Sequence, residues 1–299
     1  GLTYGQHFQT QIEQTIQFYH TFFNTSEPTI LTRAQHYADK IRAFNKNYSE
    51  EIEGIAEGAQ VDPLWIYAIN ARTEIYNELY GVSGRGECTA LYFSREGLLF
   101  QNWDWSEVME DLMVVLRVVR DDGHVVVMLV EPGMIGKVGM NGCGLGVTLN
   151  YLYVDDPDVY GGVPVHVVMR YLLDAGSLED GVSGLMEWDM GKARNLIFGS
   201  ADGWFVNFEF AGDEVYQTHG QHAFLHTNHF LGNTSKNNKD EDQDSFARYQ
   251  RANEFLSMKR MRDLSFAKEI LSDHKNEKYP ICRSYIPDPD LGLYGTVTS

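Results

Sequence analysis

One cysteine lies where a glycine-rich loop meets a run that is typical of a β-strand. Residues 81–87 (GVSGRGE) contain three glycines, and Cys88 follows them directly, just before the apolar run at 91–93. A cysteine at the end of a strained loop can attack the carbonyl group of the preceding residue, here Glu87. If the thioester hydrolyses, Cys88 becomes a new N-terminus, whose α-amine can act as the base for its own thiol.

Two other side chains would complete this chemistry. An unperturbed α-amine titrates near pH ~8, which suits it to proton transfer. The carboxylate of Asp104, in the run QNWDW, can orient the amine and hold a substrate nitrogen. The amide of Asn228, in the run HTNHF, can stabilise an oxyanion, an interaction worth roughly 3–4 kcal/mol. Spacing alone leaves a structural alternative open for each residue. Cys88 could be a buried thiol, Asp104 a carboxylate at the end of a strand, and Asn228 an amide that caps a loop.

The composition indicates a globular protein with a sizeable core. The chain has 299 residues, of which 43% are hydrophobic and 13% aromatic. Its net charge of -18 disfavours nucleic acid and anionic membranes as partners, because both bind basic surfaces. It contains no apolar run near 18 residues, so no membrane span is expected. The three cysteines are too few for a disulfide scaffold, which favours a reducing compartment.

The elements that must position these residues change in type near the glycine-rich loop. Apolar spacing predicts helices through the first 80 residues, with a start signal at Asp62-Pro63 and a helix continuing to about Leu79. Most of the later runs alternate and are rich in β-branched residues. Strands are expected at 91–93, 98–101, 113–119, 125–130, 137–140, 145–149, 195–198, 204–210, 214–218 and 224–227. Helices are expected at 163–174, 246–258 and 264–271, with a solvated loop over 232–245.

This order of elements predicts an α+β fold with sheets packed face to face and covered by helices. No internal repeat is evident. The chain begins abruptly at Gly1 and stops at Ser299 inside a β-type run, so we expect that pieces are absent at both ends.

Several segments, taken in order, resemble one family. The chain is similar to the peptidase C45 family of acyl-coenzyme A:6-aminopenicillanic acid acyltransferase-like N-terminal nucleophile (Ntn) hydrolases. The resemblance covers nearly the whole chain. The matching segments are 50–59 (EEIEGIAEGA), 70–74 (NARTE), 88–89 (CT), 101–104 (QNWD), 136–139 (GKVG), 162–164 (GVP), 226–229 (HTNH) and 281–283 (ICR).

The resemblance implies a four-layer αββα sandwich and self-cleavage between Glu87 and Cys88. Residues 1–87 would form a small chain and residues 88–299 a large chain, which stay associated as one Ntn-hydrolase domain. It also implies the roles of Cys88 as nucleophile, Asp104 as acidic partner and Asn228 as oxyanion donor. Asn150 matches a family asparagine and is expected to form a second polar wall of the pocket.

The expected activity is hydrolysis or transfer of an acyl group carried by a small amide or acyl thioester. Acyl-coenzyme A would be a substrate, and neither a metal nor a bound cofactor is expected. An intracellular location, cytoplasmic or peroxisomal, is favoured. Departures from the family motivate an alternative, an unprocessed homologue that binds an acylated small molecule without turnover: Glu87 replaces a glycine, Ala211 replaces a serine, and a family arginine falls near Tyr294.

Two further patterns have simpler interpretations. The spacing of His219, His222, His226 and His229 mimics a metal site, but no cysteine or carboxylate is in register, so zinc is disfavoured. His226 and His229 are expected instead to support the geometry around Asn228. Trp103 and Trp105 alternate with Asp104 and are interpreted as core residues, although they could also line an apolar acyl pocket.

Overall fold

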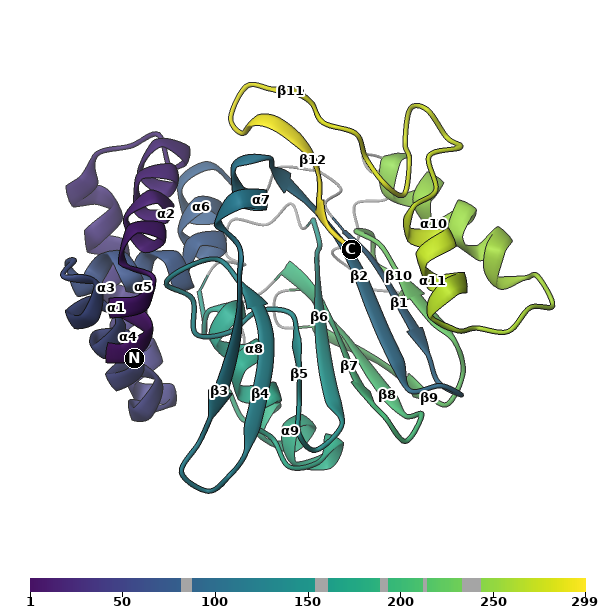
Figure 1. Ribbon diagram of the computed structural model, residues 1–299, viewed down its shortest axis with the longest axis horizontal. Helices are drawn as coiled ribbons and strands as arrows, with labels where there is room; N and C mark the ends of the chain where they lie inside the picture. The colour runs from purple at the N-terminus through teal and green to yellow at the C-terminus, as the bar shows by residue number, and fades with distance from the viewer. Residues whose placement is uncertain (82–87, 154–160, 189–192, 212–213, 233–242) are drawn as a thin grey trace. The chain divides into compact units, whose positions relative to one another are not determined.

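The computed structural model describes residues 1–81, 88–153, 161–188, 193–211, 214–232 and 243–299 (Figure 1). The chain divides into two compact units that interleave along the sequence. The first unit contains residues 1–81, 112–139 and 160–192, and the second contains residues 82–111, 140–159 and 193–299. Each unit therefore combines segments from separate parts of the chain.

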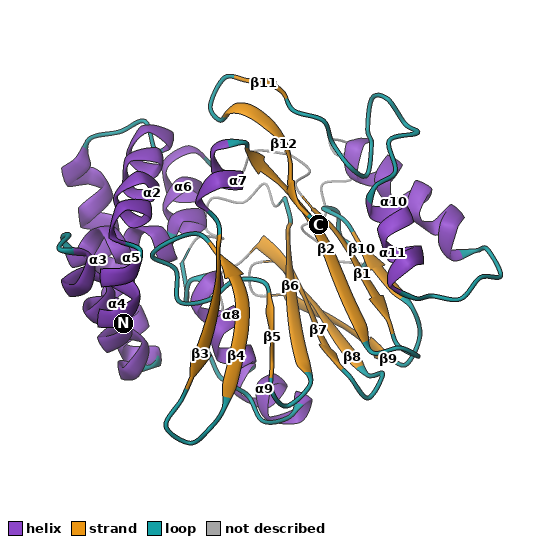
Figure 2. Cartoon of the chain, viewed as in Figure 1, coloured by secondary structure: helices purple, strands orange, loops and turns teal. Residues whose placement is uncertain are grey.

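The first unit is mainly helical, as the apolar spacing of the first 80 residues predicts (Figure 2). Its helices are α1 (Leu2–His7), α2 (Gln9–Phe22), α3 (Glu27–Phe44), α4 (Lys46–Ala59), α5 (Pro63–Asn70), α6 (Arg72–Tyr80), α8 (Val165–Leu173) and α9 (Leu178–Leu185). The unit also contains a hairpin of β3 (Val114–Val119) and β4 (Val125–Val130). Of the helices that the structure describes, none has the length and apolar character needed to cross a membrane.

Glycines set the closest helix packing in the first unit. A β-carbon on Gly5 of α1 would lie 2.1 Å from the carbonyl oxygen of Ile55. A β-carbon on Gly58 of α4 would lie 2.2 Å from the carbonyl oxygen of Leu2. Real side chains do not tolerate contacts this short, so both glycines are needed for the two backbones to approach.

The helix expected after Asp62-Pro63 forms two helices instead of one. Asp62 caps α5 as the sequence predicts, since its carboxylate accepts the backbone N–H of Leu64 at 2.8 Å. The helix ends at Asn70, whose side chain donates to the carbonyl of Gly133 at 2.9 Å and accepts the N–H of Ile135 at 3.0 Å. The expectation of one continuous helix is wrong, because this buried asparagine binds a loop that local spacing cannot reveal.

The second unit contains two antiparallel sheets. The first has the strand order β10-β1-β2-β12-β11, and the second includes the series β6-β7-β8-β9. The first sheet is formed by β1 (Cys88–Phe93), β2 (Leu98–Ser106), β10 (Phe224–His226), β11 (Ile286–Asp288) and β12 (Gly292–Thr298). The series in the second sheet is formed by β6 (Leu145–Tyr151), β7 (Ala193–Ser200), β8 (Phe205–Ala211) and β9 (Glu214–Gly220). The short elements α7 (Val108–Leu112) and β5 (Gly139–Asn141) lie at sequence boundaries between the units.

The sheets of the second unit pack face to face through buried side chains. The core between them contains Ala90, Tyr92, Ile197, Phe205 and Phe224. Helices α10 (Gln243–Leu256) and α11 (Leu264–Leu271) cover the other face of the five-stranded sheet, where they pack against Leu91 and Phe93 (Figure 1). Helix, sheet and sheet thus form successive layers, which confirms the expected α+β class with stacked sheets.

The start of α10 differs from the expectation. The sequence predicts a solvated loop over 232–245, whereas the helix already begins at Gln243. Asp244 and Ser245 are therefore helical, and Ser245 is fully buried. The polar composition of the run is misleading here, because both side chains bind buried protein partners: Asp244 pairs with Arg248, and Ser245 accepts the N–H of Asn228.

Candidate active site

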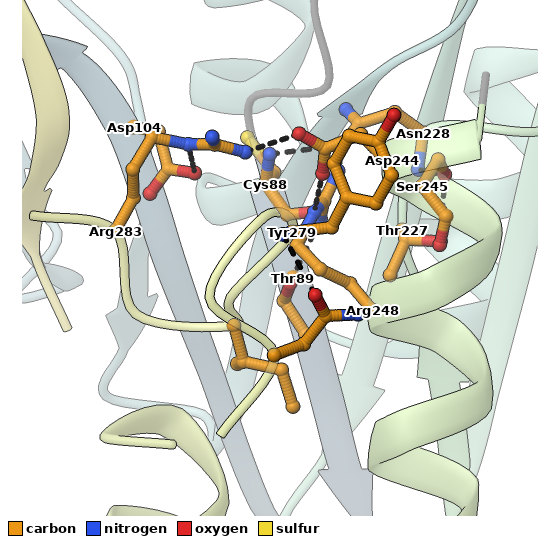
Figure 3. A network of polar contacts seen from close by, with 12 residues as sticks. Cys88, Thr89, Asp104, Thr227, Asn228, Asp244, Ser245, Arg248, Tyr279 and Arg283 are labelled. Carbon is orange, nitrogen blue, oxygen red and sulfur yellow. Dashed lines mark hydrogen bonds and ion pairs between the residues drawn. The ribbon is translucent and has the colours of Figure 1, made fainter. Parts of the chain in front are cut away.

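Cys88 begins β1 and lies beside β2. In this antiparallel pair Cys88 is directly opposite Trp103, so both side chains leave the sheet on the same face. Cys88 is buried, with 3% of the residue exposed. Its backbone N–H donates to Oδ1 of Asn228 at 3.0 Å (Figure 3). The fold thus brings together the expected nucleophile and the expected oxyanion donor, which are 140 positions apart in the sequence.

A buried arginine of α10 contacts both residues. Nη1 of Arg248 donates to the carbonyl of Cys88 at 2.6 Å and to Oγ1 of Thr89 at 2.9 Å. Its Nη2 donates to Oδ1 of Asn228 at 2.8 Å. Because Arg248 is fully buried, solvent screens its charge only weakly. A cation at this position favours the thiolate of a nearby cysteine and disfavours protonation of a nearby amine.

A row of alternating charges connects Asp104 of β2 with this arginine (Figure 3). Oγ1 of Thr296 donates to Oδ1 of Asp104 at 2.6 Å, and Nε of Arg283 lies 3.5 Å from Oδ2. Arg283 also pairs with Asp244, and Oδ1 of Asp244 accepts Nε of Arg248 at 2.6 Å. The row therefore joins the expected acidic residue to the helix that contacts the cysteine.

The carboxyl group of Asp104 has a higher pKa than an ordinary aspartate. Burial raises its pKa to about 6, and the cations of Arg248 and Arg283 limit the rise. The nearby carboxylate of Asp244 pushes the pKa of Asp104 further upwards. Shifts of this kind, caused by burial and specific charges, are typical of functional sites.

The amide of Asn228 has a defined orientation. Its backbone N–H donates to Oγ of Ser245 at 2.6 Å, and its Nδ2 donates to the carbonyl of Tyr151 at 2.9 Å. Oδ1 accepts the N–H groups of Cys88 and Arg248. Since carbonyl oxygen accepts and guanidinium donates, these partners fix which end of the amide faces Cys88.

The two histidines of the HTNHF run bind neighbouring oxygen atoms. Nδ1 of His229 lies 2.8 Å from Oγ of Ser245, and burial lowers the pKa of His229 to about 4, so its ring is neutral. His226 contacts Oε1 of Glu209 through Nε2 and the carbonyl of Thr227 through Nδ1, both at 2.7 Å. In the described part of the chain, no cluster of three or more histidine, cysteine or acidic residues could hold a metal ion.

Asn150, the expected second polar wall, lies on β6 beside this loop. Its Nδ2 donates to the carbonyl of His226 at 3.2 Å. Asn150 is directly opposite Asn195 on β7, and Asn195 is opposite Glu209 on β8. All of these residues are fully buried, so they form a polar row within the second unit. The fold places Asn150 next to the segment that carries Asn228.

A family model and a curated relative match the chain. The model for acyl-coenzyme A:6-aminopenicillanic acid acyl-transferase matches residues 93–289. The chain belongs to this acyltransferase family. The acyl-coenzyme A:6-aminopenicillanic-acid-acyltransferase 40 kDa form of Emericella nidulans is 30% identical over 248 residues, which cover 80% of this chain and 67% of the relative.

A comparison with solved structures finds an acylase and a hydrolase. Penicillin V acylase from Agrobacterium tumefaciens matches with a TM-score of 0.38 and 13% identity, covering 62% of this chain and 69% of that chain. A mutant of the conjugated bile acid hydrolase from Clostridium perfringens matches with a TM-score of 0.45 and 14% identity, covering 71% of this chain and 84% of that chain. The assignment to the acyltransferase family rests on sequence.

Membership of the acyltransferase family confirms the expected class of activity. The chain is a member of a family of acyl-transferring enzymes. The alternative of a non-catalytic binding protein is not favoured. The stacked sheets of the second unit confirm the expected α+β class.

Sequence reasoning missed three charged residues of the site. Asp244 and Arg248 are four positions apart at the start of a helix, a spacing that places both on one face and could have revealed the pair. Arg283 lies in the ICR motif, which served only to recognise the family. Glu87, the expected residue before the cut, lies outside the described residues.

Proposed function

We propose that Cys88 cuts the chain after Glu87 and then acts as the N-terminal nucleophile of an acyltransferase or amidohydrolase. The thiol attacks the carbonyl carbon of Glu87, and the C–N bond breaks as the nitrogen of Cys88 takes up a proton. Water then hydrolyses the thioester, leaving a carboxylate on Glu87 and a free thiol and amine on Cys88. The observation that supports this most is the contact of Cys88 with Asn228 beside buried Arg248.

In the cut protein, the α-amine of Cys88 takes the proton of the thiol. Oδ1 of Asn228 already accepts the hydrogen of this nitrogen in the uncut chain, and it would hold the amine in place. The thiolate attacks the acyl carbon of the substrate, the amine returns the proton to the leaving nitrogen or sulfur, and a thioester forms on Cys88. Nδ2 of Asn228, which binds the carbonyl of Tyr151 in the uncut chain, would donate to the oxyanion of both half-reactions, and the cation of Arg248 would favour the same charge.

The other expected residues have supporting roles in this proposal. Asp104 would orient the α-amine and hold the nitrogen of the substrate, and it is joined to the site through Arg283 and Arg248. Asn150 would line the pocket behind the acyl group. Each chemical step uses side chains of the protein and water or an acceptor amine, so the scheme requires neither a metal nor a bound cofactor.

The substrate we propose is a small molecule that carries an apolar acyl group as an amide or coenzyme A thioester. Trp103 leaves the sheet on the same face as Cys88, and its ring stacks on that of Trp105 at 5.9 Å. Both rings are nearly buried and offer an apolar wall close to the nucleophile. The relative in Emericella nidulans is named for an acyl-coenzyme A and an amine, which fits this chemistry.

We infer that the two products of the cut, residues 1–87 and 88–299, remain associated.

The net charge of -18 disfavours nucleic acid as a partner. The cysteines Cys88, Cys143 and Cys282 carry no disulfide, which supports an intracellular compartment such as the cytoplasm or the peroxisome.

The decisive experiment is intact mass and N-terminal sequencing of the purified protein beside Cys88→Ala. We expect two fragments, the larger beginning at Cys88, and a single uncut chain for Cys88→Ala. The cut protein is then mixed with hexanoyl-N-acetylcysteamine, a small acyl thioester, and Cys88 should gain the mass of the acyl group. A single chain in both preparations, with no acylation, would sink the proposal.

A further inference from the structure

We propose that Asp244 is a positioning residue of this site, an inference that rests on the proposed function: it holds Arg248 against Cys88 and Arg283 against Asp104. The two oxygens of its carboxylate bind different arginines. Oδ1 accepts Nε of Arg248 at 2.6 Å, and Oδ2 pairs with Nη2 of Arg283 (Figure 3). The side chain is 21% exposed, so water screens these charge-assisted bonds only in part.

The contact with Asp244 determines the orientation of the guanidinium plane of Arg248. Its Nη1 and Nη2 donate to Cys88, Thr89 and Asn228, while Nε faces Asp244. A guanidinium is planar, so fixing Nε also fixes the direction of the other two nitrogens. Asp244 and Arg248 are both on α10, one helical turn apart, so the helix backbone carries this geometry.

On its other side, Asp244 fixes Arg283 close to Asp104. Nε of Arg283 lies 3.5 Å from Oδ2 of Asp104. The guanidinium carbon of Arg283 lies 5.3 Å from the ring centroid of Tyr294, which gives the cation a second support. Asp244 therefore connects the residue that contacts the nucleophile with the residue that faces the acidic partner.

Loss of the Asp244 charge has a predictable sign at Asp104. The charged or titratable groups that act on Asp104 or respond to it are Arg248, Asp244, Cys282, Arg283 and Tyr285, and Thr296 donates to it. Asp244 is a neighbouring carboxylate, so its charge disfavours ionisation of Asp104. Asp244→Asn removes this charge and releases Arg283 from its competing partner. Asp104 should then ionise at lower pH.

The test compares Asp244→Asn and Asp244→Glu with the wild type and with Asp273→Asn. Asp273 is a matched control, because it binds Arg251 of the same helix at 2.8 and 3.1 Å. For each full-length protein we would follow self-cleavage by intact mass. We would then measure kcat and KM for hexanoyl-N-acetylcysteamine across pH, and the midpoint of thermal unfolding.

We expect Asp244→Asn to lower kcat about 10²-fold with little change in KM, as for a small misplacement of reacting groups. In the pH profile of kcat/KM, the decrease on the acidic side should occur at lower pH than in the wild type. Asp244→Glu keeps the negative charge, so the acidic side of its pH profile should match that of the wild type. Its kcat should still be reduced, because the longer side chain displaces the two arginines. Asp273→Asn should match the wild type in kcat and pH profile.

Each remaining outcome also decides the matter. Equal kcat and pH profiles for Asp244→Asn and Asp273→Asn would overturn the inference, although the proposed function would stand. An uncut but folded Asp244→Asn, with Asp273→Asn cut normally, would support positioning of Cys88. If Asp244→Asn does not fold, Asp244→Glu decides. A reduced kcat together with an unchanged melting temperature supports the inference, and a kcat equal to that of the wild type refutes it. A wild type without cleavage or turnover refutes the proposed function itself.

Discussion

The guanidinium of Arg248 makes the surroundings of Cys88 different from those of another thiol in the same unit. Burial raises the pKa of Cys282, and the carboxylate of Asp104 raises it further. At Cys88, by contrast, a fully buried cation donates to the backbone carbonyl of the cysteine itself. A fixed cation favours the thiolate. This contrast in surroundings supports the proposal that Cys88, rather than Cys282, is the nucleophile.

The raised pKa of Asp104 predicts a pH dependence of self-cleavage. Above pH of about 6 the carboxylate is ionised and pairs with Arg283, whereas below it the protonated group loses this ion pair. We expect the rate of cleavage in freshly synthesised precursor to fall as the pH drops through about 6. The uncut chain has no α-amine at Cys88, so this limb reports on Asp104 without interference from that group.

A time course of intact mass measures this rate. The pH is varied from about 5 to about 8, a range that spans the pKa of about 6. Asp104→Asn cannot ionise and serves as the control, because its slower cleavage should show no such limb. A wild-type rate that stays constant from about pH 5 to pH 7 would rule out a titrating Asp104 in the step.

Removal of the Asn228 amide should slow cleavage strongly. Asn228→Ala loses the acceptor for the Cys88 N–H and for Arg248, as well as the expected oxyanion donor. Loss of one such donor costs about 10²–10³-fold in rate, and we expect a decrease of that order in the time course. Asn253→Ala, on the exposed side of α10, is the control and should cleave normally. Cleavage of Asn228→Ala at the rate of this control would exclude the role.

Among the helices, the crossing of α1 and α4 depends on glycine. Gly58→Ala places a β-carbon 2.2 Å from the carbonyl of Leu2, so the helices must separate. We expect the free energy of unfolding to fall by about 1–3 kcal/mol, the usual cost of overpacking. Urea denaturation measures it, with exposed Glu57→Ala on the same helix as the control. Equal stability of the two variants would show that α1 can shift without cost.

The elements themselves were largely predictable from local patterns. The helix at 264–271 and the strand at 125–130 have the expected bounds, because their apolar spacing and turn signals are strong. The failures involve distant partners. The helix break at Asn70 involves a loop more than 60 positions away, and the early start of α10 at Gln243 goes with ion pairs of Asp244 to Arg248 and Arg283.

The site was predictable only in part, for the same reason. The family motifs pointed to Cys88 and Asn228, which the fold brings together. Local spacing could have suggested Asp244 with Arg248, since four positions make one helical turn. The pairing of Arg283 with Asp104, 179 positions apart by sequence number, has no local signature and emerges only from the packing of the chain.

The proposed cut between Glu87 and Cys88 would separate one segment of the first unit from its two other segments. Residues 1–81 of this unit would belong to the small chain, and residues 112–139 and 160–192 to the large chain. A buried ion cluster joins the two sets. Glu131 lies 2.8 Å from Arg72 of the small chain and 2.5 Å from Lys137 of the large chain, and it also binds Tyr19. The fragments should therefore stay together after cleavage.

We expect the proposed association to depend on the charge of Glu131. Burial opposes its ionisation, but the cations of Arg72 and Lys137 outweigh burial and lower its pKa well below the usual range. Because the folded-state pKa is depressed, the stabilisation is fully present above pH of about 4.5, the ordinary value, and declines progressively as the pH falls from there through the depressed pKa of Glu131. Acid should therefore weaken the association of the fragments.

Glu131→Gln should weaken it at neutral pH as well. The substitution leaves two buried cations without their carboxylate, a change that costs about 3–5 kcal/mol. We expect the small chain to be released from the cut protein at a lower urea concentration than in the wild type, as measured by size-exclusion chromatography. Glu50→Gln breaks an exposed pair with Lys46 and should have almost no effect. If Glu131→Gln released the small chain at the same urea concentration as Glu50→Gln, apolar packing alone would hold the fragments together.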